Sequence, residues 1–116
     1  MESKCDLWDF LLNFEVIIME YEKYVKNAQG NNAGDIFLFA LSTCVWCRKT
    51  KSLLNELGVE YSYVDVDLLE GSAKRDAVEE MEKWDQSGSF PLLIIDNSEA
   101  VLGFKESKIK GLLGFE

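Results

Sequence analysis

The residues best suited to do chemistry are two cysteines, Cys44 and Cys47, in the sequence Cys-Val-Trp-Cys. A thiolate is a strong nucleophile, and two thiols three positions apart on a helix face the same side and can close a disulfide. Such a pair is typical of thiol–disulfide exchange or of metal binding. The chain contains no histidine, which excludes Cys–His catalysis and mixed Cys/His zinc sites.

The segments around this pair predict which cysteine attacks. The apolar run at residues 36–40 is typical of a buried strand, and the helix expected after it ends at Gly58. Cys44 then lies at the helix start, where the N–H groups of Trp46 and Cys47 and the helix dipole favour a thiolate. Cysteines in such settings have pKa values of about 3.5–7.5. We therefore expect Cys44 to attack a disulfide substrate and the more shielded Cys47 to resolve the mixed disulfide.

Several groups near the pair have two interpretations each. The basic residues Arg48, Lys49 and Lys51 either add positive potential beside the thiolate or form a solvated helix face. Trp46 is either a contact for substrate or a residue that packs on the loop. The paired carboxylates Asp65/Asp67 and Glu79/Glu80 are interpreted as solvated or strand-end charges without a catalytic role.

The remaining patterns predict a β-α-β-α-β-β-α domain over residues 35–116. A helical crossover predicts parallel pairing of the first two strands, and a close turn predicts antiparallel pairing of the last two. The fold class is therefore α/β, a four-stranded mixed sheet flanked by helices. The elements expected after the first helix are a strand at 59–67, a helix at 71–84, strands at 90–95 and 100–103, and a helix at 105–113.

Residues 1–34 are expected to form an extension that ends in a polar linker at 29–34. Apolar residues recur with helical spacing over 7–25, which predicts an amphipathic helix preceding the domain. Its apolar stripe must cover the domain, a partner, or a second copy of the chain in a homodimer. Cys5 lies on this extension, and we interpret it as a free cysteine.

The charged residues of the chain limit which binding partners and which cellular compartment are expected. The formal net charge is −9, from 21 acidic and 12 basic residues, which disfavours nucleic acid as a partner. Glu2 and Asp6 stand where a secretory signal carries positive charge, and polar residues interrupt the apolar stretch at 7–25. These features predict a cytoplasmic protein that binds neither nucleic acid nor membrane.

Three motifs follow one another in the chain: Thr43-Cys44-Val45-Trp46-Cys47 after a strand, Pro91 before an apolar strand, and Gly103-Phe104 before the last helix. Together they resemble a glutaredoxin, and most of all the glutaredoxin-like proteins of archaea and anaerobic bacteria. The resemblance implies a thioredoxin-like fold, electron transfer in cell redox homeostasis, and a cis peptide bond before Pro91. The expected substrate contacts are Thr43, Val45, Trp46, Phe90, Pro91, Gly103, Phe104, Glu106 and Ser107.

Two departures from the family pattern bear on the electron donor. Leu41 stands where glutaredoxins usually carry a lysine, and Phe104 stands where they usually carry a second glycine. We therefore do not expect tight glutathione binding. Coenzyme M, another small thiol, or a flavin-dependent reductase is the expected donor, and proteins or small molecules with disulfides are the expected substrates.

Metal binding is the alternative function. Two cysteines without histidine cannot complete a zinc site within one chain. Two copies could share a [2Fe–2S] cluster, either through four protein sulfurs or with external thiols. Val45 stands where many glutaredoxins have proline, which leaves the loop less constrained. Colour after anaerobic purification would favour this alternative.

Overall fold

The structure is a computed structural model that describes residues 20–115. Ten elements follow one another in the described chain. They are η1 (Glu20–Tyr24), β1 (Lys26–Ala28), β2 (Ile36–Ala40), α2 (Val45–Leu57), β3 (Tyr61–Asp65), η2 (Val66–Leu68), α3 (Gly71–Glu82), β4 (Leu92–Ile95), β5 (Glu99–Leu102) and α4 (Glu106–Leu113). None of the helices described here is long and apolar enough to cross a membrane.

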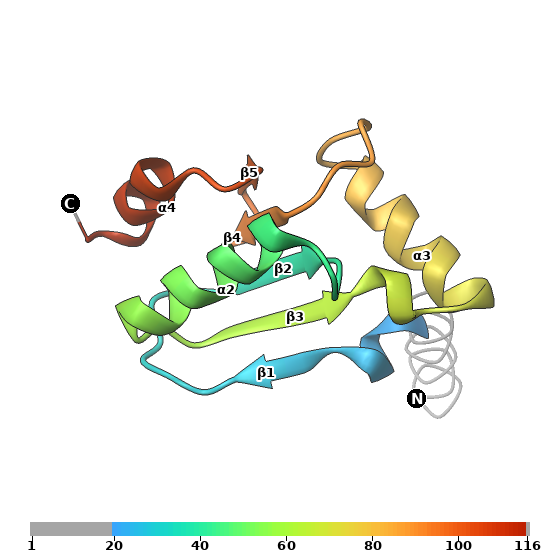
Figure 1. Ribbon diagram of the computed structural model, residues 1–116, viewed down its shortest axis with the longest axis horizontal. Helices are drawn as coiled ribbons and strands as arrows, with labels where there is room; N and C mark the ends of the chain where they lie inside the picture. Colours follow the sequence, from blue (N-terminus) through green and yellow to red (C-terminus); the bar gives the residue numbers. More distant parts are fainter. Residues whose placement is uncertain (1–19, 116) are drawn as a thin grey trace, which may run out of the picture.

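The strands form one mixed sheet in the order β1-β3-β2-β4-β5. Strands β2 and β3 are parallel and are joined through α2, whereas β4 pairs antiparallel with both β2 and β5 (Figure 1). The predicted α/β, thioredoxin-like class and the predicted order of elements are confirmed. The sheet has five strands rather than the four expected, because β1 adds an edge strand.

The extra strand lies in a region that the sequence assigned to the extension and its linker. Residues Lys26–Ala28 pair antiparallel with Tyr61–Tyr63 of β3. The segment after them approaches the chain closely at Gly30, where a Cβ would lie 2.6 Å from the carbonyl carbon of Val59. The helix predicted over residues 7–25 falls largely outside the described residues, as does Cys5, so the division into two domains stays a prediction.

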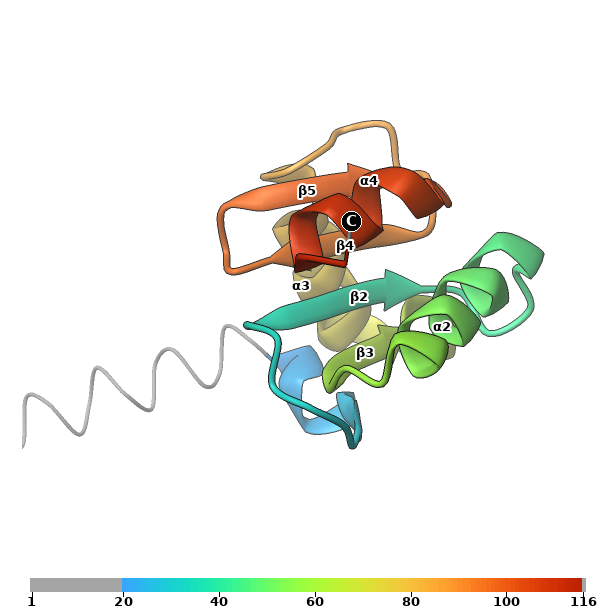
Figure 2. The ribbon, with the colours of Figure 1, turned by 90° about the vertical axis from the view of Figure 1, so that its left-hand side faces the viewer.

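The sheet separates two hydrophobic clusters, and β2 contributes to both. Its alternate residues Ile36, Leu38 and Ala40 face α2 and α4, while Phe39 belongs to the cluster that includes residues of α3 and η1. Figure 2 shows α2 and α3 on different sides of the strands. Because β2 is covered on both faces, all of its residues are apolar, which explains the unbroken apolar run in the sequence.

Helix α2 is fixed at both ends by local features. It buries Leu53 and Leu54 against the sheet, and truncating either to alanine is expected to cost about 2–5 kcal/mol. It ends at Gly58, whose φ of 72° suits glycine and whose N–H donates to the carbonyl of Asn55. Its N-cap is Cys44, so the cysteine lies directly before α2 and a few residues after the end of β2.

Candidate active site

Cys44 is the N-cap of α2. Its backbone is extended, with φ −85° and ψ 125°, and its Sγ accepts a hydrogen bond from the backbone N–H of Cys47 at 3.4 Å. Burial raises the pKa of the Cys44 thiol, but hydrogen bonds from Cys47 and from the Trp46 N–H, with the charge of Arg48, more than offset it. The net result is a Cys44 pKa below the ordinary thiol value, which favours a nucleophilic thiolate.

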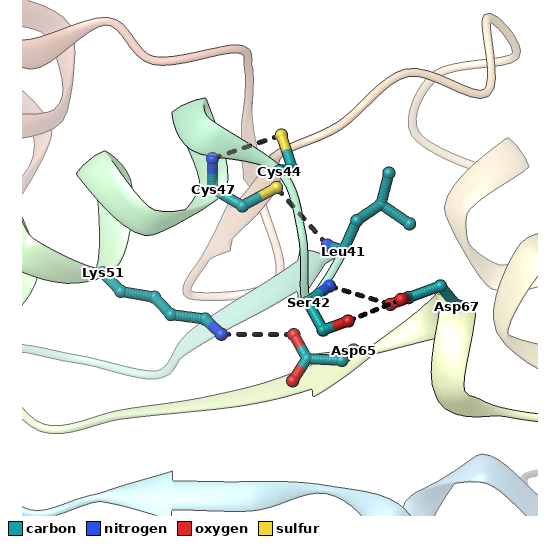
Figure 3. A network of polar contacts seen from close by, with 7 residues as sticks. All are labelled: Leu41, Ser42, Cys44, Cys47, Lys51, Asp65 and Asp67. Atoms are coloured by element: carbon teal, nitrogen blue, oxygen red, sulfur yellow. Dashed lines mark hydrogen bonds and ion pairs between the residues drawn. The ribbon is translucent and has the colours of Figure 1, made fainter.

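Cys47 has the opposite environment. It is fully buried, and its Sγ accepts a hydrogen bond from the N–H of Leu41 at 3.4 Å (Figure 3). Burial, together with the neighbouring Cys44, raises the pKa of this thiol to about 12, against the lowering effects of the Leu41 N–H and of Lys51. The two sulfurs therefore differ in access, as the sequence predicted, and also in the direction of their pKa shift.

Asp67 fixes the turn between β2 and Cys44. Its carboxylate accepts hydrogen bonds from the Ser42 N–H at 2.8 Å and from the Ser42 hydroxyl at 2.6 Å. These bonds lower the pKa of Asp67. Asp67 is exposed, in line with its interpretation as a solvated or strand-end charge, and it also has partners within the chain. The parallel register places Ala40 beside Asp65 and so brings the chain after β3 next to the turn after β2.

Asp65 also has a partner. Its Oδ1 lies 3.1 Å from Nζ of Lys51, and the two side chains are only 12% and 22% exposed. Nζ of Lys51 also lies 4.3 Å from the centre of the Tyr63 ring. The basic cluster predicted from the sequence is therefore divided: Lys51 is held against β3, whereas Arg48 is exposed.

An apolar surface lies on the outer side of the cysteine pair. Val45 is 52% exposed and Trp46 is 54% exposed. The Trp46 ring stacks on Phe104, with ring centroids 6.2 Å apart and planes 23° apart, and Nζ of Lys49 lies 5.1 Å from the Trp46 ring centroid. Trp46 thus contacts its own protein on one side and solvent on the other. We call Val45, Trp46 and Phe104 the apolar platform.

The segments around Pro91 and Gly103 lie side by side. The Phe90–Pro91 bond is cis, as the resemblance implied, and the Gly103 N–H donates to the Pro91 carbonyl at 2.8 Å. Gly103 has a φ of +84°, a conformation that favours glycine. The next residue, Phe104, reaches Trp46, so the structure brings together the late proline, the late glycine and the helix that carries the cysteines.

Three further predicted contacts are polar. Thr43 and Ser107 are exposed. Glu106 is exposed as well and forms an ion pair with Lys110 at 3.0 Å within α4. The assignment of these residues to substrate binding stays a prediction.

The sequence of residues 36–99 matches the profile of the family described as Glutaredoxin. The chain belongs to the glutaredoxin family of thiol oxidoreductases. Its fold is similar to that of the glutaredoxin from Methanosarcina mazei, with a TM-score of 0.74 and 47% identity over 79% of this chain and 89% of the other.

Two further proteins agree with this assignment. Methanosarcina acetivorans methanoredoxin is 48% identical, with a TM-score of 0.72 over 74% of this chain and 90% of its own. An uncharacterized glutaredoxin-like 8.6 kDa protein in the rubredoxin operon of Clostridium pasteurianum is 30% identical over 67% of this chain and 96% of its own length. The predicted resemblance to archaeal and anaerobic bacterial glutaredoxin-like proteins is confirmed.

Both departures from the usual glutaredoxin pattern take part in this site. Leu41, at the position usually occupied by lysine, packs against the cluster beneath α2 and donates its N–H to Cys47. Phe104, at the position of a second glycine, forms half of the aromatic stack. The glutaredoxin site thus has apolar side chains at two positions where the family usually has a cation or no side chain.

Over residues 20–115, no group of three or more Cys, Asp or Glu side chains is arranged to hold a metal ion. Within that range, the cysteines that could act as sulfur ligands are Cys44, which is half-buried, and Cys47, which is buried. A [2Fe–2S] cluster shared between two copies would take its ligands from this pair, with Cys44 as the accessible one.

Proposed function

We propose that this glutaredoxin is a dithiol thiol–disulfide oxidoreductase that uses Cys44 as nucleophile and Cys47 as resolving thiol. The observation that supports the proposal is the contrast between the two sulfurs. Cys44 is held at the start of α2 by N–H donors that favour its thiolate, whereas Cys47 is buried one turn along with a raised pKa. A nucleophile must be ionised before substrate arrives, whereas a resolving thiol is needed only afterwards.

The proposed cycle has three steps. The Cys44 thiolate attacks one sulfur of the substrate disulfide, which forms a mixed disulfide and releases the first substrate thiol. Cys47 then attacks Sγ of Cys44, which closes the Cys44–Cys47 disulfide and releases the second substrate thiol. A donor finally returns two electrons and reduces that disulfide to two thiols.

The surface beside Cys44 supports protein disulfides or small-molecule disulfides as substrates. The apolar platform of Val45, Trp46 and Phe104 offers an apolar contact next to the attacking sulfur. The Gly103–Pro91 hydrogen bond joins the segment that follows Phe90 to the residue that precedes Phe104 of this platform. An extended peptide backbone on either side of a target disulfide could pair with this segment.

The donor is proposed from the same surface. With leucine at position 41 and phenylalanine at position 104, the site lacks two features that usually serve glutathione. We propose coenzyme M or another small thiol, or a flavin-dependent reductase, as the donor. We further propose that the protein acts in the cytoplasm, with the N-terminal segment available to form a homodimer.

The test compares three donors side by side. The oxidised protein is incubated with glutathione, with coenzyme M, or with a thioredoxin reductase and its nicotinamide cofactor, and insulin disulfides are offered as the target. We expect turnover with one of the last two donors and weak turnover with glutathione. Cys44→Ser should lower the rate by about a thousandfold or more, because a serine hydroxyl is not ionised at neutral pH.

The matched control is Cys5→Ser, which should retain the wild-type rate. A Cys44→Ser protein that still reduced disulfides at the normal rate would overturn the proposal. Brown protein with visible absorbance after anaerobic purification, combined with no disulfide reduction, would favour the [2Fe–2S] alternative instead.

A further inference from the structure

The second step of the proposed cycle poses a chemical problem. Cys47 must become a thiolate to attack Cys44, yet it is fully buried, and this burial raises its pKa whether or not Cys44 is in a mixed disulfide. Only a very small fraction of such a thiol is ionised at neutral pH. A group that stabilises the thiolate as it forms would therefore determine how fast substrate is released.

Lys51 is placed to be that group. It follows Cys47 by four residues on α2, so both side chains lie on the same face of the helix. Figure 3 shows both side chains pointing from α2 towards the ends of β2 and β3. Burial raises the pKa of Cys47, whereas the N–H of Leu41 and, to a lesser extent, the charge of Lys51 lower it.

The ammonium group of Lys51 is held in place rather than free in solvent. It forms an ion pair with Asp65 at 3.1 Å and lies over the Tyr63 ring at 4.3 Å from Nζ to the ring centre. Its side chain is 22% exposed. A cation in such a position is screened by salt less than an exposed one, and fixing it in advance removes the cost of orienting it during the reaction.

The other charged groups near Cys47 do not take over this role. On α2, Arg48 is exposed, and its charge acts on Cys44. On the β3 side, the Asp65 carboxylate is paired with Lys51, and the Asp67 carboxylate accepts two hydrogen bonds from Ser42. Cys44 itself carries no charge in the mixed disulfide, so its repulsion of a second thiolate is absent at this step.

We propose that Lys51, anchored by Asp65, is a positioning residue for the resolving step, where its ammonium group stabilises the forming Cys47 thiolate. The inference rests on the proposed dithiol function. In this step the Cys47 Sγ–H proton is lost, the Cys47–Cys44 S–S bond forms and the Cys44–substrate S–S bond breaks. The electron pair of that bond leaves with the substrate sulfur, which takes up a proton and departs as a thiol.

The test follows both steps with dithiodipyridine, a neutral aromatic disulfide whose released thiopyridone absorbs light. All variants carry Cys5→Ser, so only the two site cysteines react. Cys44 releases the first thiopyridone, and resolution by Cys47 releases the second. We expect Lys51→Met to slow the second phase by about tenfold, which corresponds to about one unit in the Cys47 pKa, and to leave the first phase within about twofold.

Two controls separate an electrostatic role from a structural one. Lys51→Arg keeps the charge and should restore most of the second-phase rate. Lys83→Met removes an exposed lysine that directly follows α3 and pairs with Glu80 at 3.0 Å, and it should leave both phases unchanged. Thermal unfolding of each variant checks that the fold is retained.

The outcomes are distinct. A second phase that is equally fast in Lys51→Met and in wild type would overturn the inference, as would a loss that Lys51→Arg does not restore. Absence of a second phase in every protein, with a normal first phase, would overturn both the dithiol function and the inference. Loss of the second phase in Lys51→Met with rescue by arginine would support both.

Discussion

The outer and inner sides of the cysteine motif differ in almost every physical respect. On the outer side, Cys44 borders an apolar platform whose Val45 and Trp46 are about half exposed. On the inner side, Cys47 is fully buried and borders a polar network in which Lys51 pairs with Asp65. The outer sulfur has N–H donors that favour its thiolate, whereas burial and the neighbouring Cys44 disfavour the thiolate of the inner sulfur.

A separation of three positions is therefore enough to shift the pKa values of two identical side chains in opposite directions. The helix start supplies N–H donors to one position only, because the first turn alone has unpaired amides. The second position faces the sheet, because residues nearly one turn into α2 belong to the buried face with Leu53 and Leu54. The two directions of pKa shift follow from these placements.

After the loss of Cys44 itself, the largest effect is expected from removing the inner sulfur. Cys47→Ser should still capture a disulfide at Cys44, but it should hold the mixed disulfide and lose multiple turnover by about a hundredfold or more, because a serine cannot resolve it. Mass spectrometry of the protein after incubation with a peptide disulfide should show one covalently bound peptide. A Cys47→Ser protein that released the peptide as fast as wild type would contradict the assignment of Cys47 as the resolving thiol.

A smaller effect is expected from removing the side-chain hydrogen bond between Cys47 and the sulfur of Cys44. In a Cys5→Ser background, the rate of alkylation of Cys44 in Cys47→Ser should rise with pH to a plateau. The midpoint of this rise should lie below the pKa of a free thiol, because the lowered pKa of Cys44 keeps its thiolate populated as pH falls. Cys47→Ala cannot donate a side-chain hydrogen bond, so its midpoint should be higher. Equal midpoints in the two variants would remove that hydrogen bond from the explanation.

The smallest effect is expected on the apolar platform. Trp46→Ala should raise KM for insulin disulfides by about fivefold, in line with an aromatic contact worth about 1 kcal/mol, and should change the rate with small disulfides little. Trp46→Phe should restore most of the loss. Tyr24→Ala, at a residue of η1 that is 53% exposed, is the matched control. A KM that is unchanged in Trp46→Ala would limit the role of Trp46 to stacking on Phe104.

Much of the site could be predicted because it depends on neighbours in the chain. The apolar run at 36–40, the glycine at 58 and the spacing of the two cysteines are local signals, and they gave β2, α2 and the position of Cys44 correctly. Helix caps involve residues within about one turn of each other, so their pattern is visible in the sequence. The opposite environments of the two thiols follow from the same local geometry.

Other parts depended on segments that are distant in the chain. The sequence does not indicate that Asp67 binds Ser42, 25 positions away, or that Asp65 binds Lys51. The parallel register of β2 and β3 brings these carboxylates to the end of β2 and the start of α2. Strand β1 was missed for a related reason, because three residues at a sheet edge carry too little periodic pattern to be recognised without their partner.

The amino-acid sequence alone was therefore enough to place Cys44 at the start of a helix, because a helix cap is a local feature. Which charged groups lie near the second sulfur, and which side chains border the first, depends on the tertiary structure. Lys51 and Asp65, like Trp46 and Phe104, meet because the sheet register and the packing of α2 and α4 on one face bring separate segments together. Such contacts are set by the whole fold and leave no periodic signal in the chain.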